Sequence, residues 1–240
     1  MGVVPPTPES MKRTLKRLVG CGFDLHAYFS VLEYNRVVDP RFALPVGEAP
    51  NPIGVLIGNT RAIWPHFIEY LRANPDVIEH DNPLEQYTEK SVYEVLESAP
   101  ASTAVRFSHQ MAPAPVAMQE LAQLAGLGSL SASHLNVHQV YGPWISMRAV
   151  VVFEEFRGAV FKEPAAACTP ACEDRCRELF ESTLGAMKSR THLEIRAHWR
   201  DWVAVRDSCS TGRTYRYGED QLAYHYTHDN AILRRAIAKG

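Results

Sequence analysis

Two arginines lie in segments whose other residues are mainly apolar or aromatic. Arg148 is the one charge in the apolar run at residues 145–153, and Arg206 lies near the end of the motif HWRDWVAVRD at residues 198–207. A buried cation needs a partner or a ligand, and a planar guanidinium can hold a carboxylate through two parallel hydrogen bonds. The pattern therefore favours binding of an anionic group. The alternative is a tryptophan-anchored helix whose charges are solvated or paired.

Three of the five cysteines follow a C-x3-C-x3-C spacing at Cys168, Cys172 and Cys176. On a helix, this spacing would place all three sulfurs on one ridge. Iron–sulfur ligation typically uses tighter spacing and a fourth ligand, so we interpret the ridge as structural, with iron–sulfur, zinc and redox sensing as alternatives. Cys21 and Cys209 stand alone, and this pattern does not indicate a disulfide framework.

Neither the spacing of the histidines nor a known catalytic motif identifies a function. His134 and His138 (i, i+4) and His225 and His228 (i, i+3) could hold a metal if helical, but no further ligand completes either set. We therefore predict no dedicated metal site. Hydrolase, phosphate-loop and dinucleotide motifs are missing from the sequence, which excludes serine hydrolases and nucleoside triphosphatases.

The segment that would position Arg148 runs from residue 115 to 153. Apolar residues at three- and four-residue spacing after Pro115 predict a helix that includes Met118. Gly126 and Gly128 would end the helix and allow the backbone to approach a flat ligand. The turn at 141–144 then leads into the apolar strand. From the sequence alone, the alternative to a ligand pocket is a helix end followed by a core strand.

The remaining pattern alternates strands and helices. We predict strands at 53–58 and 104–108, and helices at 11–19, 62–71, 82–98, from 173 onward, 193–205 and 219–226. Residues 82–85 (Asn-Pro-Leu-Glu) have the form of a capped helix start. This order predicts an α+β (α/β) sandwich with a mixed sheet flanked by helices. Residues 1–10 are expected to form a flexible arm and 11–240 a single domain, helical at its C-terminal end from about 173.

Composition narrows the functional classes. The chain has 240 residues, 46% of them hydrophobic, with 25 basic and 27 acidic residues and a net charge of −2. This balance gives no support to nucleic-acid binding. No apolar run approaches 18 residues, and the first residues lack a secretory signal pattern. We therefore predict a cytoplasmic protein that does not insert into a membrane.

Two resemblances give these residues a context. The run LAGLGSLSASHLNVHQVYGPWISMRAVVVF resembles the cobalamin-binding segment of reductive dehalogenases and epoxyqueuosine reductases. From about 19 to 236 the chain is similar to the CblC family, the cobalamin-processing proteins of methylmalonic aciduria and homocystinuria type C. FALPVGEAPNPIGVLIGNTRAIWPHFIEYL, NPLEQYTEKSV and above all HWRDWVAVRD carry this similarity.

The resemblance implies a flavin-nitroreductase-like fold, which can dimerise, and a base-off cobalamin. The implied corrinoid contacts are Met118, Gln119, Gln123, Gly126, Gly128, Leu130, Ser131, Ala132, Tyr141, Trp144 and Met147. Arginines matching Arg148 and Arg206 are associated with the glutathione co-substrate, and a third would fall at Arg234 or Arg235. Gln123 departs from the family's human representative, which has histidine there, and Ser-Leu-Ser at 129–131 replaces an aromatic cluster.

The implied activity is removal of the upper ligand of a cobalamin. A thiol such as glutathione would take an alkyl group, or reduced flavin (FMN or FAD) or a partner reductase would remove cyanide. The resemblance also suggests a downstream cobalamin-accepting protein as partner. Three alternatives stay open: a non-catalytic corrinoid escort, a flavin-dependent reductase without corrinoid, and a dehalogenase-like reductase with iron–sulfur clusters.

Overall fold

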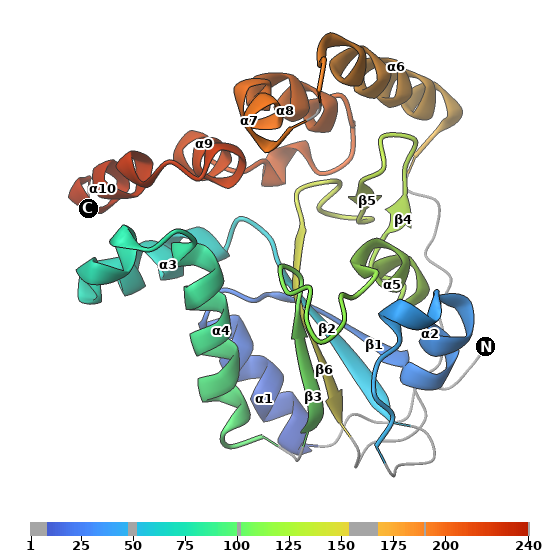
Figure 1. The fold of residues 1–240 in the computed structure, drawn as a ribbon, viewed down its shortest axis with the longest axis vertical. Helices are drawn as coiled ribbons and strands as arrows, with labels where there is room; N and C mark the ends of the chain where they lie inside the picture. The colour runs from blue at the N-terminus through green and yellow to red at the C-terminus, as the bar shows by residue number, and fades with distance from the viewer. Residues whose placement is uncertain (1–8, 48–51, 100–101, 154–167, 190, 240) are drawn as a thin grey trace.

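The computed structural model describes residues 9–47, 52–99, 102–153, 168–189 and 191–239 (Figure 1). Its strands are β1 Leu25–Ser30, β2 Ile53–Asn59, β3 Ser102–Phe107, β4 Ser129–Leu130, β5 Asn136–Val137 and β6 Ser146–Phe153. Its α-helices are α1 Glu9–Gly20, α2 Val31–Val37, α3 Ile63–Ala73, α4 Pro83–Leu96, α5 Met118–Leu124, α6 Pro170–Ala186, α7 His192–Ala197, α8 Trp199–Asp207, α9 Glu219–Thr227 and α10 Asn230–Ala238. Short 3₁₀ helices are η1 Pro40–Phe42, η2 Pro75–Glu79 and η3 Arg213–Tyr215.

β2 and β6 lie at the centre of a four-stranded sheet with the order β1-β2-β6-β3. Both are mainly apolar, and all of β2 and the last five residues of β6 are buried, as expected of strands covered on both faces. Every pairing in this sheet is antiparallel, whereas the sequence predicted a mixed sheet. β2 and β3 do run in the same direction, as their strand–helix–strand order favours, but β6 lies between them. The described strands therefore form no parallel pair.

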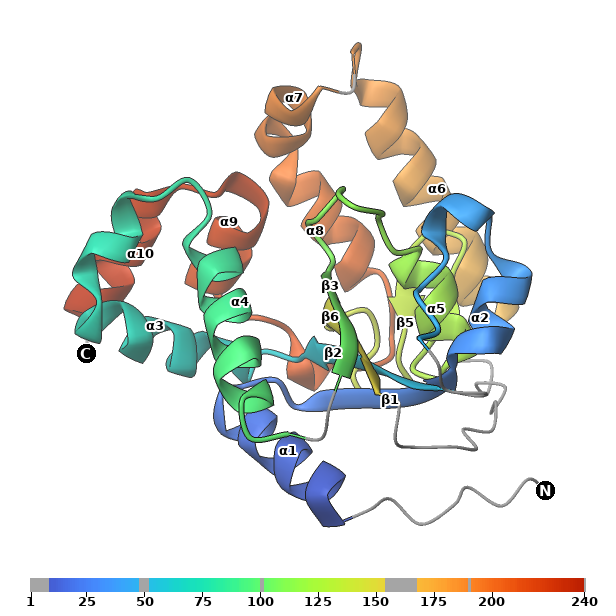
Figure 2. The same ribbon diagram turned by 60° about the horizontal axis from the view of Figure 1, so that its bottom comes forward.

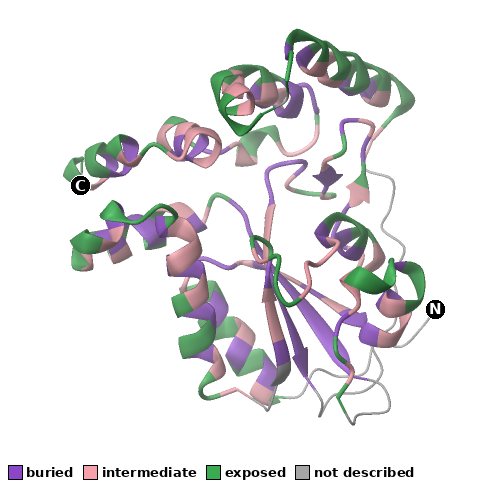
Figure 3. Ribbon diagram, viewed as in Figure 1, coloured by how far each residue is buried: buried purple, intermediate pink, exposed green. Residues whose placement is uncertain are grey.

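Helices cover both faces of the sheet (Figures 1 and 2). Successive residues of a strand point to opposite faces, so Val55 and Val151 belong to one apolar core while Leu56 and Val150 belong to the other. α1, α3 and α4 pack on the first core, and α2 and α5 pack on the second. Figure 3 shows the sheet buried between these layers. The predicted α+β sandwich is confirmed.

The C-terminal helices α6–α10 follow β6, and Figure 1 shows α6 to α8 beyond the end of the sheet at which β6 begins. The helix predicted at 193–205 is two helices, because the backbone at His198 (φ −90°, ψ 22°) interrupts it. β1, α2, α10 and the β4–β5 hairpin were not predicted. The first eight residues of the predicted arm lie outside the described residues, and α1 begins at Glu9.

The predicted capped helix start at residues 82–85 is confirmed only in part. Pro83 occupies the first turn of α4, but the Asn82 side chain makes no capping hydrogen bond as placed. Thr169, which the sequence did not single out, caps α6 by accepting a hydrogen bond from the Cys172 amide. No helix in the described part of the chain has the length and apolar content needed to cross a bilayer.

Candidate functional site

Arg148 reaches the site from the beginning of β6. Its Nε donates a hydrogen bond to Asn59 Oδ1 at 2.7 Å. Asn59 is fully buried at the end of β2 and is itself held by a 2.7 Å bond from its Nδ2 to the Thr60 carbonyl. An amide oxygen orients the guanidinium without neutralising it. Burial lowers the pKa of Arg148, and the nearby charge of Arg206 acts in the same direction.

Arg206 enters the same site from α8 and is only 9% exposed. Its guanidinium carbon lies 5.8 Å from the ring centroid of Trp144, 6.0 Å from that of Tyr217 and 5.7 Å from that of Tyr226. Its Nε and Nη1 are buried and have no hydrogen-bond partner among the described residues. Aromatic faces attract a cation but cannot satisfy N–H donors in the way an oxygen does. Arg206 therefore keeps two donors for a ligand.

The acidic residues of the α8 motif do not pair with Arg206. Asp207 accepts a hydrogen bond from Arg216 Nε at 2.9 Å, and Asp201 lies 2.8 Å from His198 Nδ1. The alternative in which the charges of this motif are paired thus holds for Asp207 and Asp201, but not for Arg206. The predicted carboxylate-binding role is compatible with this geometry.

His225 on α9 is the third ionisable residue at the site, and the sequence suggested for it only a weak metal role. Burial, followed by the charges of Arg148 and Arg206, lowers its pKa well below the ordinary value of 6.5. The imidazole is therefore neutral at neutral pH and can donate one hydrogen bond and accept another. The only sequence signal near it was its spacing to His228, which points to a different function.

These three residues line one pocket of about 300 Å³. Its apolar wall consists of Leu135, Pro143, Ile145 and Met147, and its polar wall of Ser108, Gln119, Asn136 and Ser146. None of the described residues that line it is acidic. A pocket with two cations, one neutral imidazole and mixed walls can bind an anion that has an apolar part.

Two predicted corrinoid contacts, Gln119 and Met147, line this pocket. Gln119 is exposed on α5, and its Nε2 donates to the His134 carbonyl. Gln123 accepts a hydrogen bond from the Leu130 amide through Oε1 at 3.2 Å. The glutamine that replaces the relative's histidine therefore joins α5 to the β4–β5 hairpin. Met118 is buried in the core under α5.

The two glycines after α5 fit the predicted turn. Gly126 has a positive φ of +72°. A Cβ at Gly128 would lie 2.9 Å from the Val137 carbonyl oxygen, so the close approach of the two hairpin strands requires glycine there. Within the hairpin, Leu130 is 41% exposed, whereas Ser131 is buried and bonded to Ser133.

The remaining predicted corrinoid contacts, Ala132, Tyr141 and Trp144, do not line this pocket but contact other elements around it. The Ala132 amide donates to Glu173 Oε2 of α6 at 2.7 Å. Tyr141 packs edge-on against Tyr215 with ring centroids 4.7 Å apart. A Cβ at the neighbouring Gly142 would lie 2.0 Å from the Thr211 carbonyl oxygen, so this turn is in close contact with the loop after α8. Trp144 is 1% exposed and lies beneath Arg206.

Arg234, the third predicted arginine, is not brought to the pocket. It lies on α10 and forms an exposed ion pair with Glu79 at 2.7 Å. Its side chain is 53% exposed, and it is not among the residues that line the pocket. A role of Arg234 in ligand binding therefore has no geometric support. Of the three predicted arginines, the pocket contains Arg148 and Arg206.

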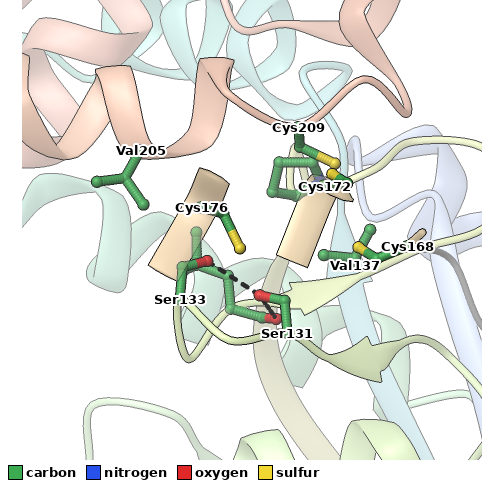
Figure 4. Close-up of a pocket in the computed structure, with 10 residues that line it drawn as sticks. Ser131, Ser133, Val137, Cys168, Cys172, Cys176, Val205 and Cys209 are labelled. Atoms are coloured by element: carbon green, nitrogen blue, oxygen red, sulfur yellow. Dashed lines mark hydrogen bonds between the residues drawn. The ribbon is translucent and has the colours of Figure 1, made fainter. Parts of the chain in front are cut away.

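The cysteines are arranged differently from the predicted ridge. α6 begins at Pro170, so Cys168 precedes the helix and cannot share its ridge. The Sγ atoms of Cys168, Cys172 and Cys209 instead lie within 4.8 Å of one another. Cys176 lines the same small cavity (Figure 4). The i, i+4 histidine pair is not helical, since His134 has a positive φ of +57°.

No family model matches the chain, and no curated protein matches its sequence significantly. Among solved structures, the C. elegans B12-trafficking protein CblC, a homologue of human MMACHC, has a similar fold. The TM-score is 0.71 at 19% identity, over 94% of this chain and 95% of that one. Epoxyqueuosine reductase from Streptococcus thermophilus is similar at a TM-score of 0.50 and 10% identity, over 95% of this chain and 79% of that one. The chain thus has a CblC-like fold over nearly its whole length, as the resemblance predicted.

Proposed function

We propose that this protein binds a corrinoid and removes its upper axial ligand, using a thiol held by Arg148 and Arg206. One observation carries the proposal: the buried Nε and Nη1 of Arg206 have no partner among the described residues, beside a second cation in a pocket without acidic walls. An unpartnered buried charge is costly unless a ligand of opposite charge binds there. The likeness of fold to a B12-trafficking protein supports the choice of corrinoid.

The residues present fit both ligands. A volume of about 300 Å³ is at the small end for ligand sites and suits a thiol of glutathione size rather than the larger corrinoid. We assign the corrinoid to the adjoining surface of α5 and the β4–β5 hairpin, where Gln119 is exposed and Leu130 offers an apolar face. Corrin binding needs such a mixture of apolar contact and polar groups for its amide fringe.

The chain's own residues would act by binding and charge. When bound with its lower base detached, a cobalamin supplies an upper bond that a thiolate can attack. Arg148 and Arg206 hold the carboxylates of the thiol and favour its ionised sulfur. His225 is neutral and adds no further charge. Holding the thiol close to its target accelerates the reaction without a general base. The alternative reductive reaction would take its electrons from a reduced flavin, FMN or FAD, or from a partner reductase.

A visible-spectrum titration with methylcobalamin, with and without glutathione, tests the proposal. We expect the main band to shift to shorter wavelength on base-off binding, and glutathione to cause slow loss of the methyl group. Arg148→Gln and Arg206→Gln should lower kcat/KM for glutathione at least tenfold while corrinoid affinity is retained. Arg200→Gln is the matched control, because Arg200 lies on the same helix as Arg206 but is exposed over Trp199.

The other outcomes favour the alternatives. A spectral shift without turnover by any thiol would indicate an escort protein. A flavin spectrum on purification, with no corrinoid shift, would indicate a flavin-dependent reductase. Equal loss of activity in Arg200→Gln and Arg206→Gln would show that the effect is one of general charge and not of this pocket.

A further inference from the structure

Three thiols from two separate parts of the chain meet in the C-terminal region. Cys168 precedes α6, Cys172 lies in the first turn of α6, and Cys209 follows α8. Their sulfurs lie within 4.8 Å of one another, and all are free thiols. Cys172 and Cys209 are buried and Cys168 is partly buried. The three thiols therefore meet inside the fold and not on its exposed surface.

The space that these thiols border is the size of one atom. The cavity has a volume of about 10 Å³, close to the minimum for one water molecule. Apolar side chains, including Val137 and Val205, form part of its wall, and Cys176 also borders it (Figure 4). An organic ligand cannot enter such a space, but a single ion can.

We propose that Cys168, Cys172 and Cys209 bind one Zn²⁺ ion, with Cys176, which borders the same cavity, as a candidate for a fourth ligand. Soft sulfur ligands favour Zn²⁺ or Cu⁺ among biological cations, and the divalent ion leaves less net negative charge in an apolar cavity. In a tetrahedral site with Zn–S bonds of about 2.3 Å, the sulfurs are about 3.8 Å apart. The observed cluster reaches this spacing by movements of about 1 Å. Each ligand thiol releases its proton to solvent as its bond to the ion forms, and no oxidation occurs.

One arginine contact joins the two segments that carry the cysteines. Arg175 of α6 donates a hydrogen bond to the Ser208 carbonyl after α8. Arg213 Nε donates to the Cys209 carbonyl at 3.4 Å. These contacts help to hold Cys209 beside Cys172 in the folded chain.

The ion would join α6 to the end of α8 and so hold Arg206 in place. Leu135 and Pro143 line both the cysteine cavity and the arginine pocket. Val205 faces the first of these, and the next residue, Arg206, faces the second. The zinc site thus has a structural role at the border of the candidate functional site. Its existence does not depend on the identity of the ligand in that pocket.

The test begins with the full-length protein, purified under reducing conditions without chelator and analysed for metal. We expect one Zn²⁺ per chain, and Co²⁺ in its place should give the intense sulfur-to-cobalt absorption of a thiolate site. Cys172→Ser and Cys209→Ser should weaken Zn²⁺ binding at least tenfold. Cys21→Ser, which changes the one cysteine that does not border the cavity, should retain the ion.

A second measurement keeps the proposal falsifiable if the serine variants fail to fold. Alkylation of the wild-type thiols, mapped by mass spectrometry with and without Zn²⁺, should show protection of the cluster but not of Cys21. The proposal is overturned if the reduced apoprotein takes up no Zn²⁺, or if Cys21→Ser loses the ion equally. Copper retained in place of zinc, or a disulfide within the cluster in the reduced preparation, would also overturn it.

Discussion

Replacement of Arg206 by methionine should make the unliganded protein more stable while it impairs thiol binding. Methionine has a similar length and can keep the contacts with Trp144, Tyr217 and Tyr226. It removes a buried charge whose Nε and Nη1 have no partner among the described residues. Residues that serve binding are often held at a cost to stability, and this substitution measures that cost directly.

The magnitude follows from two opposing contributions. Each buried donor without a partner costs about 1–3 kcal/mol, and three ring contacts near the 6 Å limit offset about 0.5 kcal/mol each. Relaxation of the protein around a buried charge reduces its free-energy cost, so we expect a net cost near the lower end of the range that these values give. We expect Arg206→Met to raise the free energy of unfolding by about 1–2 kcal/mol, which for a chain of this size raises Tm by about 2–8 °C. Loss of one charge-assisted hydrogen bond, about 1.5–3 kcal/mol, should by itself weaken thiol binding about 10- to 150-fold.

Urea unfolding, thermal melting and glutathione-dependent turnover are the assays. Arg206→Lys is the matched control, because it keeps the charge and loses the bidentate fork. It should reduce turnover without the gain in stability. If Arg206→Met were instead less stable than the wild-type protein by more than about 1 kcal/mol, the reasoning would fail, since Arg206 would then have a stabilising partner that its geometry does not reveal.

Two further predictions, one of them with a control substitution, concern the pocket and its surroundings. Gly128→Ala should lower the free energy of unfolding by about 1–3 kcal/mol and weaken corrinoid binding, because the new Cβ would lie 2.9 Å from the Val137 carbonyl oxygen. Gly185→Ala on α6, where the new Cβ would meet no atom from outside its own helix turn within 4 Å, should be neutral or stabilising in the same urea melts. His225 stays neutral when folded but takes up a proton below about pH 6.5 when unfolded. Stability should therefore fall as pH drops below 6.5, by up to about 1.4 kcal/mol per pH unit from this residue. His225→Gln should reduce that slope between pH 7 and 5, and an unchanged slope would count against the pKa argument.

Much of the sheet could be predicted because its central strands are visible in the sequence. β2 and β6 are mainly apolar, with Arg148 as the one charge in them, so local pattern identifies both strands. β1 was not predicted, because its sequence LHAYFS is short and combines polar with apolar residues. Its stability comes from pairing with β2, a partner distant in sequence. The predicted mixed sheet was wrong about strand pairing for the same reason. Strand order places β6 between β2 and β3, and no local pattern encodes that order.

The candidate site shows the same limit more sharply. Arg148 and Arg206 could be identified as unusual charges, but only the folded chain brings them to one pocket. His225 gave no useful signal, because its significance comes from those two neighbours. Cys209 appeared isolated in the sequence, and the folded chain brings it to Cys172. The ridge predicted from the C-x3-C-x3-C spacing was wrong, because the prediction assumed one helix through Cys168, whereas α6 begins after that residue.

The electrostatics of the pocket narrow the kind of ligand that it can bind. Arg148 has a neutral partner in Asn59, Arg206 has aromatic rings as neighbours, and His225 is uncharged. Neither guanidinium is therefore neutralised by its immediate contacts, and two positive charges repel one another at the site. A ligand with two carboxylates could relieve both, whereas a neutral thiol could relieve neither and would leave the buried donors of Arg206 unsatisfied. For the thiol that we propose as ligand, this arrangement favours one with two carboxylates over small uncharged thiols, because discrimination by a missing hydrogen-bond partner is far stronger than discrimination by size.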